Sequence, residues 1–374
     1  MIYIHIPFCK KSCNYCDFHF SVNTDSMHQM VDAICLEMNL RNGYLPKGTP
    51  IETVYFGGGT PSLLSLESLD RIFNSIHKNF SLSESFECTL EANPDDLDKI
   101  KLTELKSTPI NRLSIGVQSF HDSELVFMNR AHDSSQAIRS VYDSAEIGFD
   151  NITIDLIYGI PGSGIGKWAT NLEQAFSLPV KHLSCYGLTI EPKTMLHKAV
   201  LSRHVLPEPD EAYAEQFSYL MDAAIAHGFE HYEISNFAKP GFRSRHNSRY
   251  WNNTSYIGLG PSAHSYNGME RSWNVPNNAT YIRFLQSGNL SYTSEILSIK
   301  DKYNEHVMTR LRTIDGVSLD HICRNYGKEF EIHFNENVKQ YLDSGHIILK
   351  NGHYSLSRSG QHLADRIASD LFIV

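Results

Sequence analysis

The first half of the chain alternates short apolar runs with longer segments in which apolar residues recur every three or four positions. The short runs predict strands and the longer ones helices, because side chains repeat every two residues on a strand and about every 3.6 on a helix. Val31, Ile34 and Met38, for example, fall on one face of a predicted helix. The predicted strands are residues 2–6, 52–56, 86–91, 111–117, 152–158 and 182–188, and the predicted helices between them include 27–40, 66–80, 96–106 and 134–148.

Six β/α units in succession indicate a parallel sheet with right-handed crossovers. The pattern leaves open a doubly wound sheet and a complete or partial β/α barrel. It therefore predicts an α/β class, and the choice among these three architectures needs further observations.

The second half of the chain has a different pattern. It predicts a helix over residues 210–228, a strand over 232–237, and then an irregular stretch rich in Asn, Gly and Ser up to about residue 277. The tail predicts helices over 300–313, 316–327, 335–345 and 358–372, and a hairpin over 346–357. Asn351-Gly352 suits a type I′ turn in that hairpin. Helices followed by a hairpin are typical of a winged-helix arrangement.

Composition and charge limit the class of partner. The chain has 374 residues, 41% of them hydrophobic, and a net charge of -9, which argues against general nucleic-acid binding. Residues 1–11 do not resemble a signal peptide, and no apolar run approaches the ~20 residues that span a bilayer. We therefore expect a cytoplasmic protein that meets a membrane only through a partner. Its seven cysteines are then expected to be thiols or metal ligands.

Cys9, Cys13 and Cys16 follow the first predicted strand at spacing C-x3-C-x2-C. Three thiolates on one tight loop can ligate three irons of a [4Fe–4S] cluster and leave the fourth iron open. An open iron can chelate the amino and carboxylate groups of S-adenosylmethionine. A zinc site is the alternative, and His5 or His19 could supply the fourth ligand that structural zinc usually needs.

Other polar and glycine positions follow the predicted strands. A Gly-Gly-Gly-Thr-Pro run comes directly after the second strand, where glycine permits a close backbone approach to a ligand. Glu91, Gln118, Asp155 and Thr189 lie at or beyond the ends of later strands, or within one of them. In a β/α barrel these positions collect at one mouth, where active sites lie. Singly, each is as well explained as a loop cap or a satisfied core group.

Several segments together carry a family resemblance. They are IHIPFCKKSCNYCDF, YFGGGTPSLL, EANP, RLSIGVQSF, DLIYGIPG and RHNSRYW. They resemble the radical S-adenosylmethionine family related to oxygen-independent coproporphyrinogen III oxidase, and most closely its haem-chaperone (HemW-like) branch. The resemblance runs from Tyr3 through the C-terminal region and implies a partial (β/α)6 barrel with Cys9, Cys13 and Cys16 as cluster ligands. It places around the cluster and cofactor Tyr3, Tyr15, Gly58, Gly59, Thr60, Glu91, Gln118, Arg130, Asp155 and Thr189.

Two features favour the haem-chaperone branch over the oxidase. The oxidase pattern has a fourth cysteine two residues after the third, where this chain has Phe18. The segment HNSRYW matches a motif that the resemblance associates with haem. An imidazole can ligate haem iron and arginines can pair with propionates. The candidate haem contacts are His246, Arg249, Tyr250 and Trp251, with Arg243, Arg245 and His264 as further candidates.

The sequence thus predicts a [4Fe–4S] protein that binds S-adenosylmethionine and haem, a haem chaperone with an unidentified acceptor protein. The alternatives are a coproporphyrinogen III oxidase and a radical methyltransferase acting on a porphyrin-like substrate. We expect the barrel within residues 1–285, including a haem-motif extension over about 205–285, and a C-terminal winged-helix-like domain over 286–374.

Overall fold

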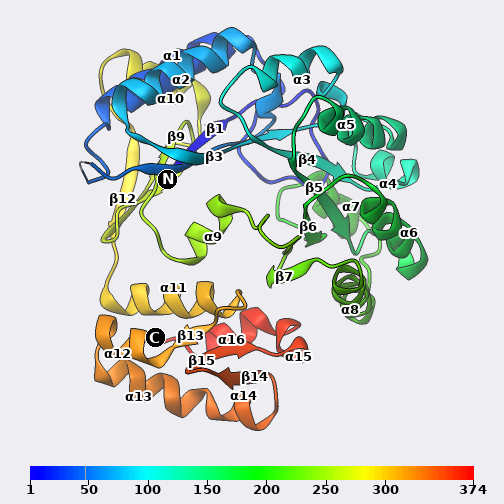
Figure 1. The fold of residues 1–374 in the computed structure, drawn as a ribbon, viewed down its shortest axis with the longest axis vertical. Coiled ribbons are helices and arrows are strands. Elements are labelled where there is room, and N and C mark those ends of the chain that lie inside the picture. Colours follow the sequence, from blue (N-terminus) through cyan, green and yellow to red (C-terminus); the bar gives the residue numbers. More distant parts are fainter. Residues whose placement is uncertain (47) are drawn as a thin grey trace.

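A twisted sheet forms the frame of the molecule. The computed structural model describes residues 1–46 and 48–374, and within them nine strands join in the order β7-β8-β6-β5-β4-β3-β2-β1-β9. Strands β1 to β6 run parallel and follow chain order, which makes the predicted partial (β/α)6 barrel (Figure 1). Their bounds are β1 Ile2–Ile6, β2 Ile51–Gly58, β3 Leu82–Ala92, β4 Arg112–Gln118, β5 Asn151–Tyr158 and β6 His182–Gly187.

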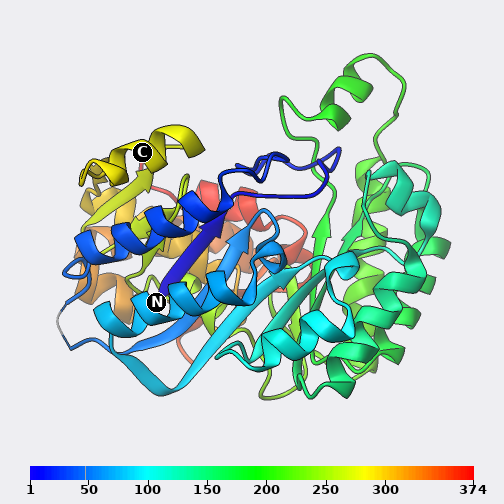
Figure 2. The same cartoon turned by 90° about the horizontal axis from the view of Figure 1, so that it is seen from above.

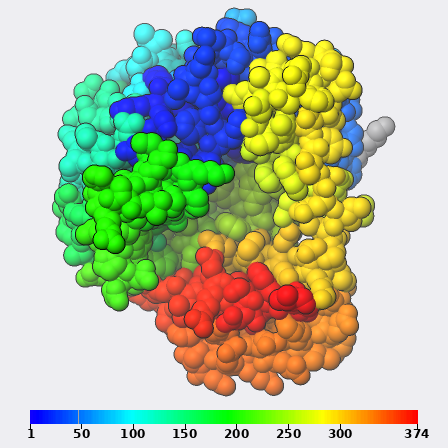
Figure 3. Space-filling view, turned by 180° about the vertical axis from the view of Figure 1, so that it is seen from behind, coloured from blue at the N-terminus to red at the C-terminus, as the bar shows by residue number. Residues whose placement is uncertain are grey.

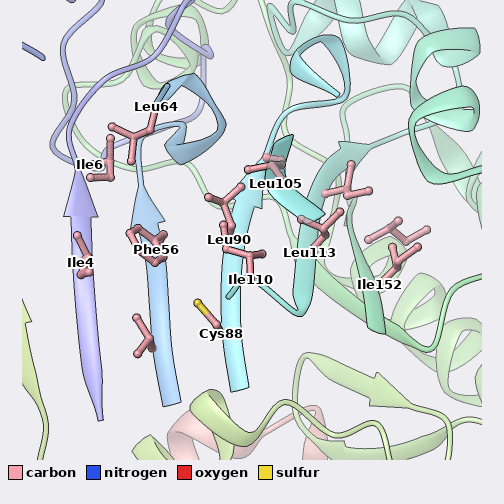
Figure 4. Packing of buried hydrophobic residues seen from close by; sticks show 14 of the residues in the cluster. Ile4, Ile6, Phe56, Leu64, Cys88, Leu90, Leu105, Ile110, Leu113 and Ile152 are labelled. Atoms are coloured by element: carbon pink, nitrogen blue, oxygen red, sulfur yellow. The ribbon is translucent and has the colours of Figure 1, made fainter. Parts of the chain in front are cut away.

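Helices cover the outer, convex face of this sheet (Figure 1). The largest are α1 Met27–Leu40, α2 Leu66–Asn79, α3 Lys99–Lys106, α5 Ser134–Glu146, α6 Gly164–Ser177 and α8 Asp210–Ala226. Their apolar faces and the strands form one core, in which Ile4, Phe56, Leu90 and Leu113 are fully buried (Figure 4). The predicted helices and strands of this half are confirmed, with ends that differ from the prediction by a few residues.

The prediction for residues 232–277 is wrong in two respects. The expected single strand is an antiparallel pair, β7 Glu230–Glu233 and β8 Asn236–Ala238, which extends the sheet beyond β6. The expected irregular stretch contains helix α9 Arg245–Trp251 and strands β9 Ile257–Leu259, β10 His264–Tyr266 and β11 Glu270–Asn274. These strands have three to five residues, too few to show a period, and β9 pairs with the distant β1.

Helix α10 Asn278–Gln286 and strand β12 Tyr292–Ile296 follow, and β12 pairs with β11. The last part of the chain has its own hydrophobic core and forms a separate lobe, orange to red in Figure 3. Its elements are α11 Ile299–Leu311, β13 Val317–Ser318, α12 Leu319–Tyr326, α13 Lys328–Asn337, α14 Lys339–Asp343, β14 Ile347–Lys350, β15 His353–Leu356, α15 Arg358–Gln361 and α16 Ala364–Asp370.

The predicted hairpin turn of this lobe is confirmed. Asn351 and Gly352 both have positive φ, 52° and 79°, as a type I′ turn requires, and they join β14 to β15. The predicted division of the chain at residue 285 stays a prediction. In the described residues, we find no helix both long and apolar enough to cross a membrane.

Candidate functional site

The three motif cysteines lie on the loop that follows β1, at the carboxyl end of the parallel strands. Cys9, Cys13 and Cys16 are all half-buried free thiols. Figure 2 shows this loop in dark blue, reaching over the sheet toward the green segment that carries α7 Met195–Leu201. Thiols that are neither sealed in the core nor fully exposed suit a cluster that needs one open iron.

Hydrogen bonds to two distant segments hold the loop in place. The side chain of Asn14 donates to the carbonyl of Phe127 at 2.8 Å, and that of Asn129 donates to the carbonyl of Ser12 at 2.7 Å. From the other side, the backbone N–H of Leu196 donates to the carbonyl of Asn14 at 2.8 Å. The polar residues between the cysteines therefore fix the shape of the loop.

Arg130 connects the cysteine loop to the sheet. Its Nη1 donates to Sγ of Cys13 at 3.2 Å, while its Nη2 donates to Asn93 Oδ1 at 2.6 Å and to the Gly116 carbonyl at 2.8 Å. A guanidinium in this position offers a charge-assisted hydrogen bond to the sulfur. The structure thus places Arg130 against a cysteine that the family resemblance expects to ligate the cluster.

The glycine run makes room for the protein's own backbone. A Cβ on Gly59 would lie 2.5 Å from the Phe8 carbonyl oxygen, and one on Gly58 would lie 2.7 Å from the ring of His5. Gly59 therefore lets the start of the cysteine loop pack against the end of β2, and Gly58 makes room for His5 on β1. Gly58 also has a φ of +107°, in the region that favours glycine. Thr60 beside them is buried and accepts a hydrogen bond from the side chain of Asn93 at 3.2 Å.

Two half-buried carboxyl groups lie on strands of the barrel near this mouth. Glu91 on β3 accepts a hydrogen bond from Tyr55 Oη at 2.7 Å, and Asp155 on β5 accepts one from Ser114 at 3.3 Å. Burial raises the pKa of Glu91 to about 7 and that of Asp155 to about 6. Such displaced pKa values are typical of binding and catalytic sites, because a charged or hydrogen-bonding ligand completes them.

Gln118 has a strained backbone at the end of β4. Its φ is +67°, and the pairing of β4 with β5 shifts register just before it. Non-glycine residues in this conformation are uncommon and often occur at functional sites. Thr189, beyond the end of β6, is exposed, while Tyr15 is half-buried against a small apolar cluster that includes Leu125 and Leu196.

Sequence reasoning missed Tyr55, Asn93 and Ser114, which position the site residues named above. Tyr55 pairs in register with Tyr3, and their rings stack with centroids 6.1 Å apart. The alternation of side chains along a strand shows only that Tyr55 lies on the same face of β2 as Thr53. Nothing in the sequence shows which face of β2 turns toward Glu91.

The zinc alternative gains no fourth ligand from the nearby histidines. His5 donates through Nε2 to the carbonyl of His19 at 2.9 Å and contacts Tyr3 Oη through Nδ1 at 3.2 Å. His19 in turn hydrogen-bonds with Asn278 at 2.7 Å. Across residues 1–46 and 48–374, no group of three or more His, Cys, Asp or Glu side chains, the motif cysteines included, is gathered closely enough to hold a single metal ion. A [4Fe–4S] cluster has a different requirement, because each of the three thiolates ligates a separate iron of the cubane.

The HNSRYW segment is a helix and lies inside the concave side of the sheet, between β2 and α11 (Figure 1). His246 is 1% exposed, and both of its ring nitrogens have partners. Nδ1 contacts Thr53 Oγ1 at 2.8 Å and Nε2 contacts Tyr250 Oη at 3.2 Å. Burial lowers the pKa of His246 to about 3, so the imidazole is neutral. It has no ring nitrogen free for iron in this arrangement.

The arginines around α9 are also paired. Arg249 and Arg245 both form ion pairs with Glu52 at the start of β2, and Arg243 pairs with Glu230 at 3.1 Å. The indole N–H of Trp251 is buried and lacks a hydrogen-bond partner among the described residues. The structure therefore brings the four motif residues together on one helix, yet His246, Arg249 and Tyr250 are committed to contacts within the protein.

A partial (β/α)6 barrel with an open three-thiol loop at its mouth defines the class of radical S-adenosylmethionine proteins. Residues 3–174 match the model of the radical SAM superfamily, and residues 297–363 match that of the HemN C-terminal domain. A [4Fe–4S] cluster and S-adenosylmethionine follow from this class. The donor set fits the cluster, since three half-buried thiols share one anchored loop.

Within that class, full-length relatives define the family. The chain is 35% identical over 370 residues to the heme chaperone HemW of Bacillus subtilis, covering 98% of this chain and 97% of that protein. It is 33% identical to the heme chaperone HemW of Lactococcus lactis, with 91% and 89% covered. The chain belongs to the HemW family of radical SAM proteins. The fold is also that of the Escherichia coli coproporphyrinogen III oxidase HemN, with a TM-score of 0.85, 22% identity, and 99% of this chain and 89% of that chain covered.

Proposed function

We propose that this protein is a haem-binding carrier that keeps the cluster and cofactor machinery of its class and delivers haem to an acceptor protein. The observation that supports this proposal most directly is the sequence of the cysteine loop. The third thiol is followed by Asp17 and Phe18, where the oxidase pattern has a fourth cysteine, and the Phe18 side chain is 68% exposed. The relatives named heme chaperone HemW support the same assignment over nearly the whole chain.

In this proposal Cys9, Cys13 and Cys16 ligate the cluster, and Arg130 donates a hydrogen bond to Sγ of Cys13 from the side of the sheet. The bound cluster supplies an open iron that chelates the amino and carboxylate groups of S-adenosylmethionine. The residues proposed to surround that cofactor are Tyr3, Tyr15, Gly58, Gly59, Thr60, Glu91, Gln118, Arg130, Asp155 and Thr189. Glu91 and Asp155 can each accept a hydrogen bond from the cofactor, or hold a proton themselves near neutral pH.

For haem, the sequence predicts His246, Arg249, Tyr250 and Trp251. His246 could ligate iron only after giving up its contact with Thr53 or Tyr250, and Arg249 could meet a propionate only by leaving Glu52. These four contacts stay a prediction. We place the protein in the cytoplasm, with haem and an acceptor protein as its partners and without a nucleic-acid partner.

The experiment is to reconstitute the cluster anaerobically and to incubate the protein separately with haem and with coproporphyrinogen III, each with S-adenosylmethionine. A carrier takes up haem to about one per chain and releases no decarboxylated porphyrinogen. More than one product molecule per chain, without haem uptake, would assign the oxidase activity instead. Products are resolved by chromatography and haem uptake by absorption titration.

A further inference from the structure

A polar cleft lies between the end of α9, α11 and α12, at the junction of the barrel and the C-terminal lobe. Its volume is about 520 Å³, within the range of about 300–1,000 Å³ typical of small-molecule sites. Figure 1 shows α9 on the barrel side and α11 on the lobe side of this junction. No aliphatic side chain is among the described residues that line the cleft, so it suits a polar ligand.

Two imidazoles in the wall of this cleft have unused hydrogen-bonding capacity. His306 on α11 is 6% exposed, and its Nε2 is buried and has no hydrogen-bond partner among the described residues. Its ring stacks on that of His321 on α12, with centroids 4.3 Å apart and planes within 9° of each other. His321 is exposed, and in the described structure it hydrogen-bonds only through its backbone, to Ser318 and Asn325. A buried nitrogen without a partner costs free energy, so a ligand that bonds to it gains affinity.

Both rings can present an N–H group to a ligand. Burial lowers the pKa of His306 to about 3 and also lowers the pKa of His321, so neither imidazole needs to be charged near neutral pH. A neutral imidazole carries one N–H, which donates a hydrogen bond. The two rings therefore supply donors, and the charge that attracts a ligand must come from another side chain.

That charge is the ammonium of Lys302, which is half-buried on α11 and lines the cleft. Across the part of the chain that the structure describes, it has no carboxylate partner, and none of the lining residues is Asp or Glu. Glu305, three residues further along the same helix, pairs with Arg271 at 2.8 Å instead. Arg310 also lines the cleft, but its guanidinium pairs with Asp315 at 3.5 Å and is hydrogen-bonded within the protein. The cleft therefore offers one unpaired positive charge to an anion.

The type of donor favours a phosphate group over a carboxylate. The planar fork of a guanidinium matches a carboxylate best, and the arginine of the described lining is already engaged. The remaining donors are the ammonium, the two imidazoles and the hydroxyls of Tyr266 and Tyr326, which come from α11, α12 and β10. A phosphate ester has three strong acceptor oxygens, which can accept from donors that approach from different elements.

We propose that this cleft binds the phosphate group of a small polar metabolite, with Lys302 pairing with the phosphate and His306 and His321 donating hydrogen bonds to it. The site lies apart from the cysteine loop, and the inference does not depend on the proposed function. Asn252 and Tyr266 line the cleft from the barrel side, and the lysine and the two histidines line it from the lobe side. The bound compound therefore bridges the two parts of the chain, and its binding should raise the melting temperature.

The test is calorimetric titration of the full-length protein, with its cluster reconstituted anaerobically and with saturating S-adenosylmethionine, so that the barrel site is already filled. The probes are adenosine monophosphate, ribose 5-phosphate and inorganic phosphate, and adenosine and ribose are the uncharged controls. We expect a phosphate ester to bind and the two uncharged controls not to bind. Binding of adenosine monophosphate without ribose 5-phosphate would assign the ligand to the nucleotides. Binding of both esters would assign the affinity to the phosphate group that they share.

Variants locate the bound phosphate in the cleft. Lys302→Gln should weaken binding of the phosphate ester by about ten- to hundredfold, because it removes the unpaired charge. His321→Ala should weaken binding by about tenfold, since it removes one donor. Lys302→Arg keeps the charge and should bind nearly as tightly as the wild type. Lys339→Gln is the matched control, because this lysine is exposed on α14 and does not line the cleft, and it should leave binding unchanged.

The inference is overturned if none of the three phosphate probes binds to the wild type even at millimolar concentration. It is also overturned if Lys302→Gln and His321→Ala bind the probes as tightly as the wild type, because the phosphate would then lie elsewhere. Cluster content and the melting temperature without probe, measured for every variant, show which variants have folded. If Lys302→Gln does not fold, the comparison of His321→Ala with Lys339→Gln decides.

Discussion

The cysteine loop and helix α9 both carry dense polar motifs, and they contact opposite ends of β2. Thr60, just after β2, meets the cysteine loop, while Glu52 and Thr53 at its start meet α9. In the loop, backbone and amide groups satisfy one another, and the three thiols are left partly exposed. In α9 the potential ligand itself, His246, is buried with both nitrogens engaged.

This difference teaches how to interpret a polar motif. A binding group must keep unsatisfied bonding capacity at an accessible place, because breaking existing buried hydrogen bonds to bind a ligand costs free energy. The cysteine loop meets that condition. His246 does not meet it, although its motif is as distinctive in the sequence.

The largest expected effect tests the cysteine-loop side of this comparison. Replacing Cys9, Cys13 or Cys16 with Ala should abolish cluster assembly, since a cubane with one open iron needs all three thiolates. Anaerobically reconstituted wild type should hold about four irons per chain, as one cubane requires. Cys35→Ala and Cys323→Ala are matched controls on half-buried thiols elsewhere and should keep the iron. Stoichiometric zinc without iron in the wild type would contradict the assignment.

The second prediction tests the α9 side of the comparison, where His246 is buried. His246→Ala should lower the free energy of unfolding by about 2–4 kcal/mol, because it leaves a cavity and strips Thr53 and Tyr250 of their partner. Urea denaturation followed by circular dichroism measures the change. His264→Ala, an exposed histidine on β10, serves as the control. A His246 variant as stable as wild type would show that this imidazole is not structural and is free to act as a ligand.

The third prediction concerns Glu91 and the dependence of stability on pH. Its carboxyl has a pKa of about 7 in the fold and 4.5 when solvent-exposed, so between these values the folded apoprotein holds a proton that the unfolded chain has released. The free energy of unfolding should therefore fall as pH rises through this interval, by roughly 1–3 kcal/mol in total. Asp155, with a pKa raised to about 6, acts in the same direction.

Glu91→Gln should flatten that profile, while Glu84→Gln, an exposed residue on the same strand, should leave it unchanged. The measurement is the urea midpoint of the apoprotein between pH 5 and pH 8. A profile that rises with pH in the wild type, or that persists in the Glu91 variant, would place the proton elsewhere.

The smallest effect concerns Arg130, which lies at the boundary of the site. Arg130→Gln removes the positive charge that lies beside Cys13, and it should increase the rate at which a chelator removes the cluster by about tenfold. The control Arg139→Gln, on the exposed face of α5, should have no effect on this rate. Cluster absorbance over time gives the rate. An unchanged rate would mean that the contact with Cys13 only positions the loop.

Much of the barrel could be predicted from the sequence because its strands are buried on both faces and its helices are amphipathic. The segments 2–6 and 27–40 coincide with β1 and α1 residue for residue. The short strands β8, β9 and β10 could not be predicted, since three residues carry no period, and the partner of β9, strand β1, is far along the chain. The same limit hid the contribution of Tyr55, whose role depends on the register between β2 and β3.

By itself, the sequence determined the fold class and the cluster chemistry. Hydrophobic periodicity is a local property, and the C-x3-C-x2-C spacing places three thiols on one loop whatever surrounds it. Only the tertiary structure decided which polar groups form hydrogen bonds within the protein and which remain free to bind a ligand. Thr53 and Tyr250 occupy the nitrogens of His246, whereas Cys9, Cys13 and Cys16 stay half-buried free thiols. Hydrogen-bond satisfaction depends on neighbours brought together by folding, and a motif contains only one side of each pair.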